Sequence, residues 1–230
     1  RLGICLPHET VKLTIQCFQE LPEDIPEIDA LVRWSVTRNL AFPAQDMAIS
    51  WTSMGRDAKR GQVLLVAMMS QLVLAQYRKE IQSIGAVPMG FSPTVMNRFN
   101  LYVSALPVTG SCLYLALSKW VVTLAGFIEG VPLFFKTFRK GFLHGGMDRH
   151  GRDISLMLDH CFMSCPGILF SRVFVDLHGV KVKNLEALLR EKGIGHVTIL
   201  NPLDFIDLGG QFFDTDEASL FTATATAAFV

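Results

Sequence analysis

The chain has 230 residues, half of them hydrophobic, and its 21 basic residues balance 21 acidic ones. A hydrophobic content this high excludes a disordered tail and predicts either one elaborate domain or two small ones. Because no dense Lys/Arg stripe occurs, the chain lacks the positive field that drives nucleic-acid binding, and we expect no nucleic-acid partner.

The first part of the chain alternates predicted strands and helices. Runs rich in β-branched and apolar residues between polar turns predict strands, and apolar residues three and four apart predict helices. In chain order we expect a pair of strands at 2–6 and 11–18, a helix at 26–40, strands at 47–54 and 62–69 that pair with each other, a helix at 70–84 and a strand at 87–91. Pro26 suits the first turn of the first helix, Pro43 ends that helix, and Gly85 ends the second.

The second part begins with a helix after Ser92-Pro93 and continues with strongly apolar strands. Three strands at 112–118, 120–128 and 131–139 are predicted to form a meander, with a turn at Glu129-Gly130. After a glycine-rich loop at 141–151 we expect a helix to about residue 164, a strand at 168–175, a helix at 181–192, a strand at 196–200 and a last helix from residue 216. This alternation predicts an α/β fold.

The cysteines and the longest apolar stretch indicate where the chain resides. Five cysteines mostly lie inside apolar runs, and an odd number fits a reducing compartment better than a disulfide framework. Lys119, Glu129 and Gly130 interrupt the most apolar stretch, so no spanning helix of about 20 apolar residues is predicted. The opening at Arg1 has no signal-peptide pattern, and whether the chain is a fragment that lacks its natural start is left open. The predicted location is the cytoplasm.

Several short motifs follow one another in a defined order. The predicted helix at 26–40 contains Leu31-Val32-Arg33-Trp34, and Asn39-Leu40-Ala41-Phe42-Pro43 and Ile49-Ser50-Trp51 follow it. Val63-Leu64-Leu65-Val66-Ala67, a helix and Gly85-Ala86-Val87-Pro88 come next, and Asn201-Pro202 follows the later strand–helix–strand segment. This order resembles that of the PilM family of actin-like proteins, in which a V-R-W-E helix ends at I-P-F-P and a V-L-L-V-A strand and a G-L-x-P turn follow. The resemblance covers most of the chain.

The resemblance implies an actin-like (ribonuclease-H-like) ATPase fold, truncated or degenerate, with an inserted 1C subdomain. Residues 1–91 would form the 1C-like subdomain, and residues 92–230 would be remnants of the 1A and 2A ribonuclease-H-like cores. The 2B-like subdomain would be absent or reduced to the loop at 141–151. The hairpin that carries the first phosphate loop would precede Arg1.

The nucleotide-binding motifs of this family are altered in the chain. Its members hold nucleotide with D-x-G-x-x-S/T phosphate loops, in which the Asp orients metal or water, and with a G-G-x-S-x-L adenosine loop. Lys119-Trp120 stands where the second phosphate loop needs small residues. The positions that replace the family's nucleotide-binding residues are Ala116, Ser118, Val122, His178, Gly179 and Val180. We therefore expect a pseudo-ATPase without catalytic residues, metal or nucleotide cofactor.

The resemblance also implies a binding role. PilM-like proteins bind the cytoplasmic N-terminal peptide of a PilN-like membrane protein in a groove between 1A and 1C, and they contact motor ATPases. The chain would be a non-catalytic cytoplasmic adaptor or scaffold of a type IV pilus or type II secretion platform, peripheral at the inner membrane and indirectly attached to it. The implied partner-binding residues are Arg33, Trp34, Phe42 and Pro43. Homo-oligomerisation is left open, as is the choice between pilus and secretion.

An ATP-binding actin-like ATPase of pilus assembly is the alternative, should a D-x-G-x-x-S/T hairpin precede Arg1. A zinc site is not expected, because no second Cys pair has finger spacing; its potential ligands are His160, Cys161, Cys165 and His178. No G-x-S-x-G elbow or paired carboxylates indicate a hydrolase or a sugar-nucleotide enzyme. Trp34 and Trp51 also suit a core role.

Overall fold

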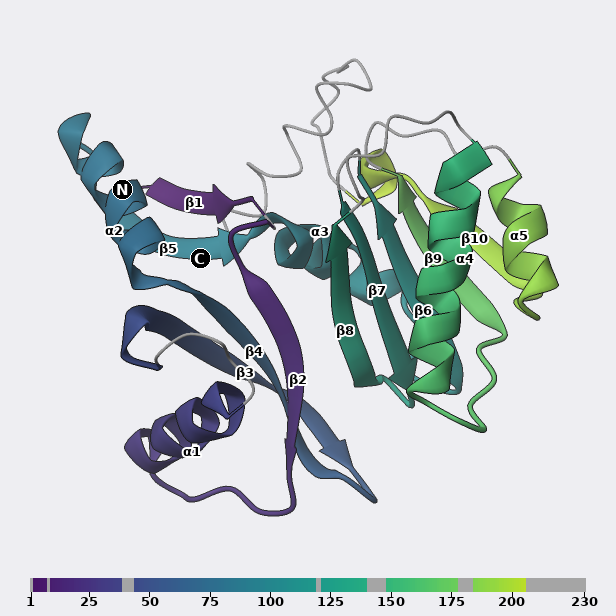
Figure 1. Cartoon of the computed structure of the whole chain (residues 1–230), viewed down its shortest axis with the longest axis horizontal. Helices are drawn as coiled ribbons and strands as arrows, with labels where there is room; N and C mark the ends of the chain where they lie inside the picture. The colour runs from purple at the N-terminus through teal and green to yellow at the C-terminus, as the bar shows by residue number, and fades with distance from the viewer. Residues whose placement is uncertain are drawn as a thin grey trace. The chain divides into compact units, whose positions relative to one another are not determined.

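The computed structural model describes residues 2–7, 9–38, 44–118, 121–139, 148–177 and 184–205 (Figure 1). The chain divides into two compact units, Arg1–Pro93 and Thr94–Val230. We expected a boundary after residue 91. The assignment of these units to the 1C, 1A and 2A subdomains stays a prediction.

The first unit contains an antiparallel sheet in the order β2-β4-β3. Its strands are β2 (Lys12–Phe18), β3 (Met47–Asp57) and β4 (Gly61–Ser70). The predicted pairing of the two longer strands is confirmed, but both strands extend further and leave only residues 58–60 as the turn. Helix α1 (Ile25–Thr37) has a proline in its first turn and no side-chain hydrogen bond at its N-cap. It covers one face of this sheet. Ile28, Val32 and Val36 of α1 pack there on Leu64, Val66 and Met68 of β4.

A second, two-stranded sheet in this unit pairs β1 (Leu2–Leu6) in parallel with β5 (Pro88–Pro93). Helix α2 (Gln71–Ser83) connects β4 to β5, and Gly85 with φ +75° follows its end. The first two strands form where predicted but do not pair with each other. Thr10 donates a hydrogen bond from its N–H to the Pro7 carbonyl at 3.0 Å, and the chain turns there from one sheet to the other.

The second unit is built on a five-stranded sheet in the order β10-β9-β6-β7-β8. The meander is confirmed: β6 (Ser111–Leu117), β7 (Val121–Ile128) and β8 (Val131–Arg139) pair in antiparallel fashion. Glu129 and Gly130 form the β7–β8 turn with φ of 50° and 73°. Strands β9 (Arg172–Leu177) and β10 (His196–Leu200) complete the sheet in parallel with β6.

Helices cover both faces of this sheet. On one face, α4 (Asp148–Met163) and α5 (Leu185–Glu191) bury Leu158 and Leu189 against Leu115 and Val175 of the strands (Figure 1). On the other face, α3 (Thr94–Tyr102) packs Phe99 on aromatic rings of β6, β7 and β8. Short 3-10 turns lie at Ala44–Asp46, Val103–Ala105 and Pro202–Asp204. The unit is a three-layer α/β arrangement.

Several predicted boundaries in the second unit were wrong. Helix α4 starts at Asp148, so it includes residues 148–151, which we expected to belong to the glycine-rich loop at 141–151. Strand β9 starts at Arg172 rather than at residue 168. After α4 the chain makes a turn in which Gly167 adopts φ +82°, and the strand begins only beyond this turn. The rest of that loop and the predicted last helix lie outside the described residues. Within the described part of the chain, no helix has the length and hydrophobicity to cross a bilayer.

Candidate functional site

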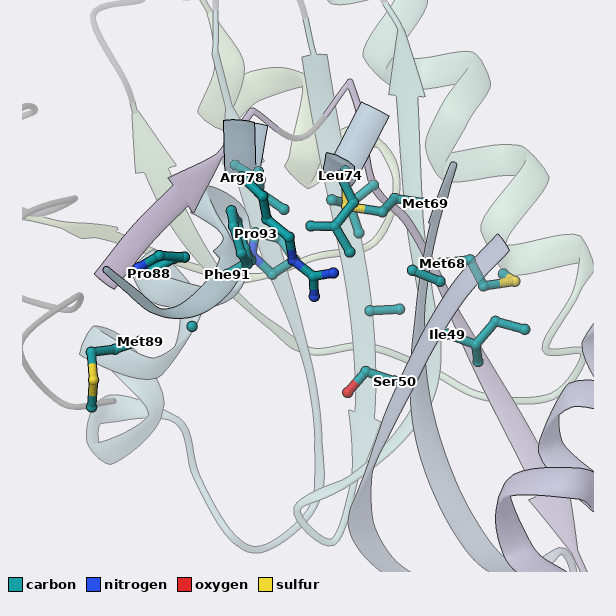
Figure 2. A pocket seen from close by; sticks show the side chains of 15 residues that line it. Ile49, Ser50, Met68, Met69, Leu74, Arg78, Pro88, Met89, Phe91 and Pro93 are labelled. Carbon is teal, nitrogen blue, oxygen red and sulfur yellow. The ribbon is translucent and has the colours of Figure 1, made fainter. Parts of the chain in front are cut away.

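The first unit contains a pocket of about 440 Å³ (Figure 2). Its walls come from both sheets of the unit and from α2. The residues that line it are Leu6, Val11, Ala48, Ile49, Ser50, Ala67, Met68, Met69, Leu74, Arg78, Pro88, Met89, Gly90, Phe91 and Pro93. Pockets of this size that are mostly apolar with few polar groups are typical of ligand and peptide sites.

The pocket exists because small side chains line one face of the three-stranded sheet. Side chains alternate between the faces of a strand, so Val66 of β4 points to α1 and the next residue, Ala67, points to the opposite face. Ser50 of β3 lies directly across from Ala67, and Ala48 lies two residues before it on the same face. These three small side chains leave a hollow that Phe91 of β5 and Leu74 of α2 border.

One charged side chain, that of Arg78, lines this pocket. Arg78 lies on α2, and its guanidinium carbon is 5.8 Å from the centroid of the Phe91 ring, a cation–π distance. Figure 2 shows the guanidinium reaching into the space between Phe91 and Ser50. The remaining lining residues are uncharged, and three of them are methionines, whose flexible side chains adapt to different apolar partners.

The pocket is bordered by the outer strand of a sheet. β3 is the last strand in the order β2-β4-β3, so one of its edges pairs with no other described strand. Residues 48–50 of this strand line the pocket. An open strand edge beside apolar pockets is the arrangement that binds extended peptides by strand addition.

The two predicted partner-binding residues that the structure describes do not line this pocket. Arg33 and Trp34 lie on α1, which covers the face of the sheet opposite to the one that carries Ala67 and Ser50. Arg33 donates a hydrogen bond to the Met47 carbonyl at 3.2 Å, which ties α1 to β3. Phe42 and Pro43 lie outside the described residues. A role for these four residues in partner binding stays a prediction.

The two predicted core tryptophans differ in their surroundings. The Trp51 ring packs against the core beneath α1, and its Nε1 donates a hydrogen bond to Asp29 Oδ1 at 2.5 Å. Trp34 is 58% exposed, and the Arg38 guanidinium carbon lies 4.8 Å from its ring centroid. Trp51 is therefore a structural residue, whereas Trp34 contributes apolar surface.

The turn after β6 is the place where the family's second phosphate loop was expected. Ala116 lies near the end of β6, Val122 is buried in β7, and Ser118 lies between the strands. The Ser118 N–H donates to the Val121 carbonyl at 2.9 Å, and the Val121 N–H donates to the Ser118 hydroxyl oxygen at 3.1 Å. Both backbone N–H groups therefore donate their hydrogen bonds within the turn. His178, Gly179 and Val180 lie outside the described residues.

A buried ion pair lies beside this turn. Asp176 of β9 stands opposite Ala116 in the sheet register and is fully buried. Arg98 of α3 donates from Nε to Asp176 Oδ2 at 2.7 Å and from Nη2 to Oδ1. Tyr114 and Tyr102 donate their hydroxyl protons to the same carboxylate at 3.2 and 3.4 Å. Both carboxylate oxygens are thus occupied by protein donors.

The ionisation of this cluster is set by its burial. Burial disfavours the charge on Arg98, but the hydrogen bond and negative charge of Asp176 outweigh that effect and raise the pKa of Arg98. Burial, followed by the charge of Asp176, raises the pKa of Tyr114 and of Tyr102. Arg98 therefore stays charged and both tyrosines stay protonated at neutral pH. No local motif marks this cluster in the sequence, because Arg98 and Asp176 are 78 residues apart.

The potential zinc ligands that the structure describes, His160, Cys161 and Cys165, lie in the last turn of α4 or just after it. Cys161 is fully buried in the core beneath α4, and burial raises the pKa of its thiol to about 11. His160 is exposed, with its ring edge-on to Phe138 at 6.2 Å. Within the described ranges, no three His, Cys, Asp or Glu side chains gather in a way that could hold a metal ion.

Comparison with known proteins adds structural relatives. No protein-family model matches the sequence, and no curated protein sequence matches it. A chain of a PilM–PilN type IV pilus biogenesis complex is similar in structure, with a TM-score of 0.71 and 14% identity over 96% of this chain and 76% of that one.

Two further solved structures are similar. One is a Bacteroides thetaiotaomicron protein with an actin-like ATPase fold and unknown function, with a TM-score of 0.53 and 13% identity over 91% of this chain and 69% of that chain. The other is the cytoplasmic domain of EpsL, an inner-membrane component of the Vibrio cholerae type II secretion system, with a TM-score of 0.51 and 11% identity over 96% of this chain and 73% of that chain. The chain thus has a mixed α/β fold that matches structures of the actin-like ATPase fold.

Proposed function

We propose that this chain is a non-catalytic adaptor that binds an extended cytoplasmic peptide of a PilN-like membrane protein in the pocket of its first unit. The pocket carries the proposal, since it combines an apolar lining, small side chains at its floor and a strand edge at its border. Such a site holds a peptide through main-chain hydrogen bonds along β3 and through apolar side chains that enter the hollow.

The structural relatives support this assignment. The relative with a TM-score of 0.71 comes from a PilM–PilN complex, and another comes from a type II secretion inner-membrane component. The adaptor would act in the cytoplasm at the inner membrane, attached through its peptide partner, and would connect that partner to a motor ATPase of the pilus or secretion machine.

The absence of catalysis is part of the same proposal. The N–H groups of Ser118 and Val121 in the turn after β6 already donate hydrogen bonds within that turn, and the nearby carboxylate of Asp176 is paired with Arg98. A phosphate loop needs available amides and a carboxylate that can orient metal or water. These contacts favour an adaptor over the ATPase alternative.

Peptide titration tests the proposal. We expect the labelled N-terminal peptide of the PilN-like protein from the same organism to bind in fluorescence polarisation, and its scrambled version not to bind. Ser50→Trp fills the floor of the pocket and should weaken binding at least roughly tenfold, or about 1.4 kcal/mol. Thr52→Trp is the matched control, because Thr52 lies two residues further along β3, is exposed and does not line the pocket.

Two results would contradict the proposal. Equal binding of the native and scrambled peptides would exclude a specific peptide site. Equal affinities of the Ser50→Trp variant and the unaltered chain would move the site away from the pocket. The second result, together with a loss of binding in Arg33→Ala and Trp34→Ala, would place the peptide on α1.

A further inference from the structure

Arg78 differs in charge from the other residues that line the pocket. Among the described residues that line the pocket it is the one charged side chain, and it is exposed to solvent. Within the described part of the chain, its guanidinium makes no hydrogen bond or ion pair and lies against the Phe91 ring. An arginine carries five N–H donors in a planar fork that matches a carboxylate.

An entirely apolar peptide in this pocket would leave the charge of Arg78 without a partner. Apolar side chains that cover the hollow also remove water from the guanidinium, and a desolvated charge without a partner costs binding free energy. The guanidinium of Arg78 lies over the Phe91 ring, and this contact holds the charged end of the side chain at the pocket. A negatively charged group on the occupant removes this penalty.

We propose that the peptide bound in this pocket is recognised by an acidic side chain, Asp or Glu, that pairs with Arg78 while neighbouring apolar side chains fill the hollow. This inference rests on the proposed function, because there the occupant is the N-terminal segment of a chain that continues to the membrane, so its chain-terminal carboxylate lies elsewhere. A side-chain carboxylate, rather than a chain-terminal one, is then the anion within reach. The pair would fix the register of the peptide along β3, since a two-residue shift would move the carboxylate by about 7 Å.

A charge scan of the peptide tests this inference. Each position of the PilN-like peptide is changed in turn to Glu, Gln and Lys, and affinity for the full chain is measured by fluorescence polarisation. We expect one position at which Glu binds roughly tenfold more tightly than Gln, and at which Lys binds more weakly than Gln. The preference should decrease as salt concentration rises, because screening weakens partly exposed ion pairs.

Variants of the chain assign this preference to one residue. Arg78→Gln should abolish the difference between Glu and Gln at that position, and Arg78→Glu should reverse it in favour of Lys. Lys79→Gln is the matched control, since Lys79 is the next residue of α2, is exposed and does not line the pocket, so the preference should persist. Arg, Gln and Glu all favour helices, so these changes should leave α2 folded.

The outcomes separate this inference from the proposed function. A peptide that binds the pocket with the same affinity for Glu, Gln and Lys at every position would overturn the role of Arg78 and leave the adaptor function standing. A preference for Glu that survives Arg78→Gln would also overturn it. Failure of every peptide to bind would overturn the proposed function and this inference with it.

Discussion

Removal of the Arg98 charge should destabilise the second unit strongly. Arg98 and Asp176 expose only 5% and 1% of their side chains, and two hydrogen bonds join them. Arg98→Met keeps most of the buried aliphatic volume but leaves a buried carboxylate with only the Tyr102 and Tyr114 hydroxyls as donors. Breaking a buried ion pair in this way costs ~3–5 kcal/mol. For a chain of this size, that loss lowers Tm by roughly 10 °C.

A double variant in which Asp176 is also replaced by an uncharged carboxamide provides the control. Asp176→Asn combined with Arg98→Met leaves no buried charge and retains an acceptor for the tyrosine hydroxyls. The double variant should therefore be more stable than Arg98→Met alone, although the interaction between the two sites makes their effects non-additive. A hydrophobic pair would be a less informative control, because it would leave both hydroxyls without an acceptor.

Urea unfolding followed by circular dichroism measures the loss of stability, and native-state hydrogen exchange locates it. Peptides from β6 and β9 should exchange up to roughly a thousandfold faster in Arg98→Met, as ~4 kcal/mol corresponds to about three powers of ten. Peptides from β2 and β4 serve as the internal reference. A loss below ~1 kcal/mol would refute the reasoning, because it would mean that the pair behaves like a solvated surface ion pair.

Three further predictions follow from the described contacts. Burial raises the pKa of Cys112 and Cys161 from 9.0 to about 11, so the folded chain keeps thiol protons that the unfolded chain releases. The contribution of these thiols to stability is complete below pH 9 and is lost as pH rises toward 11; urea unfolding across this range should show the decline, and a slope unchanged by Cys112→Ala with Cys161→Ala would contradict it. Gly61 and Gly85 both have positive φ, but an added Cβ would lie 2.6 Å from the Gln19 Cα at Gly61 and would meet nothing within 4 Å at Gly85. Gly61→Ala should thus lower Tm further than Gly85→Ala, because Gly85→Ala introduces only the ~1–2 kcal/mol of left-handed backbone strain. Equal losses of Tm in thermal unfolding would show that the β3–β4 turn relaxes around the added Cβ of residue 61. Millimolar Mg²⁺–ATP should leave Tm unchanged in a thermal-shift assay that includes a nucleotide-binding actin-like protein as positive control; a saturable increase would favour the ATPase alternative, because a ligand that binds only the folded state must stabilise it.

Local signals in the sequence were sufficient for most elements. The run 62–69 predicted β4, and the meander around Glu129-Gly130 formed as expected, because a strand pattern and a two-residue turn are determined by neighbouring residues. Gly85 and Gly193 follow helices and adopt φ of +75° and +83°, a conformation that glycine tolerates and other residues disfavour. The α/β class followed from the order of these elements.

The tertiary structure alone decided which elements that are distant in the sequence meet. The sequence indicated strands at 2–6 and 11–18, but only packing showed that β1 pairs with β5 and β2 with β4. The same non-local contacts bring Ser50, Ala67 and Arg78 to one pocket and join Arg98 to Asp176 across 78 residues. A periodic pattern specifies which face of an element is apolar but not which distant element covers it, so neither site could be recognised from the sequence.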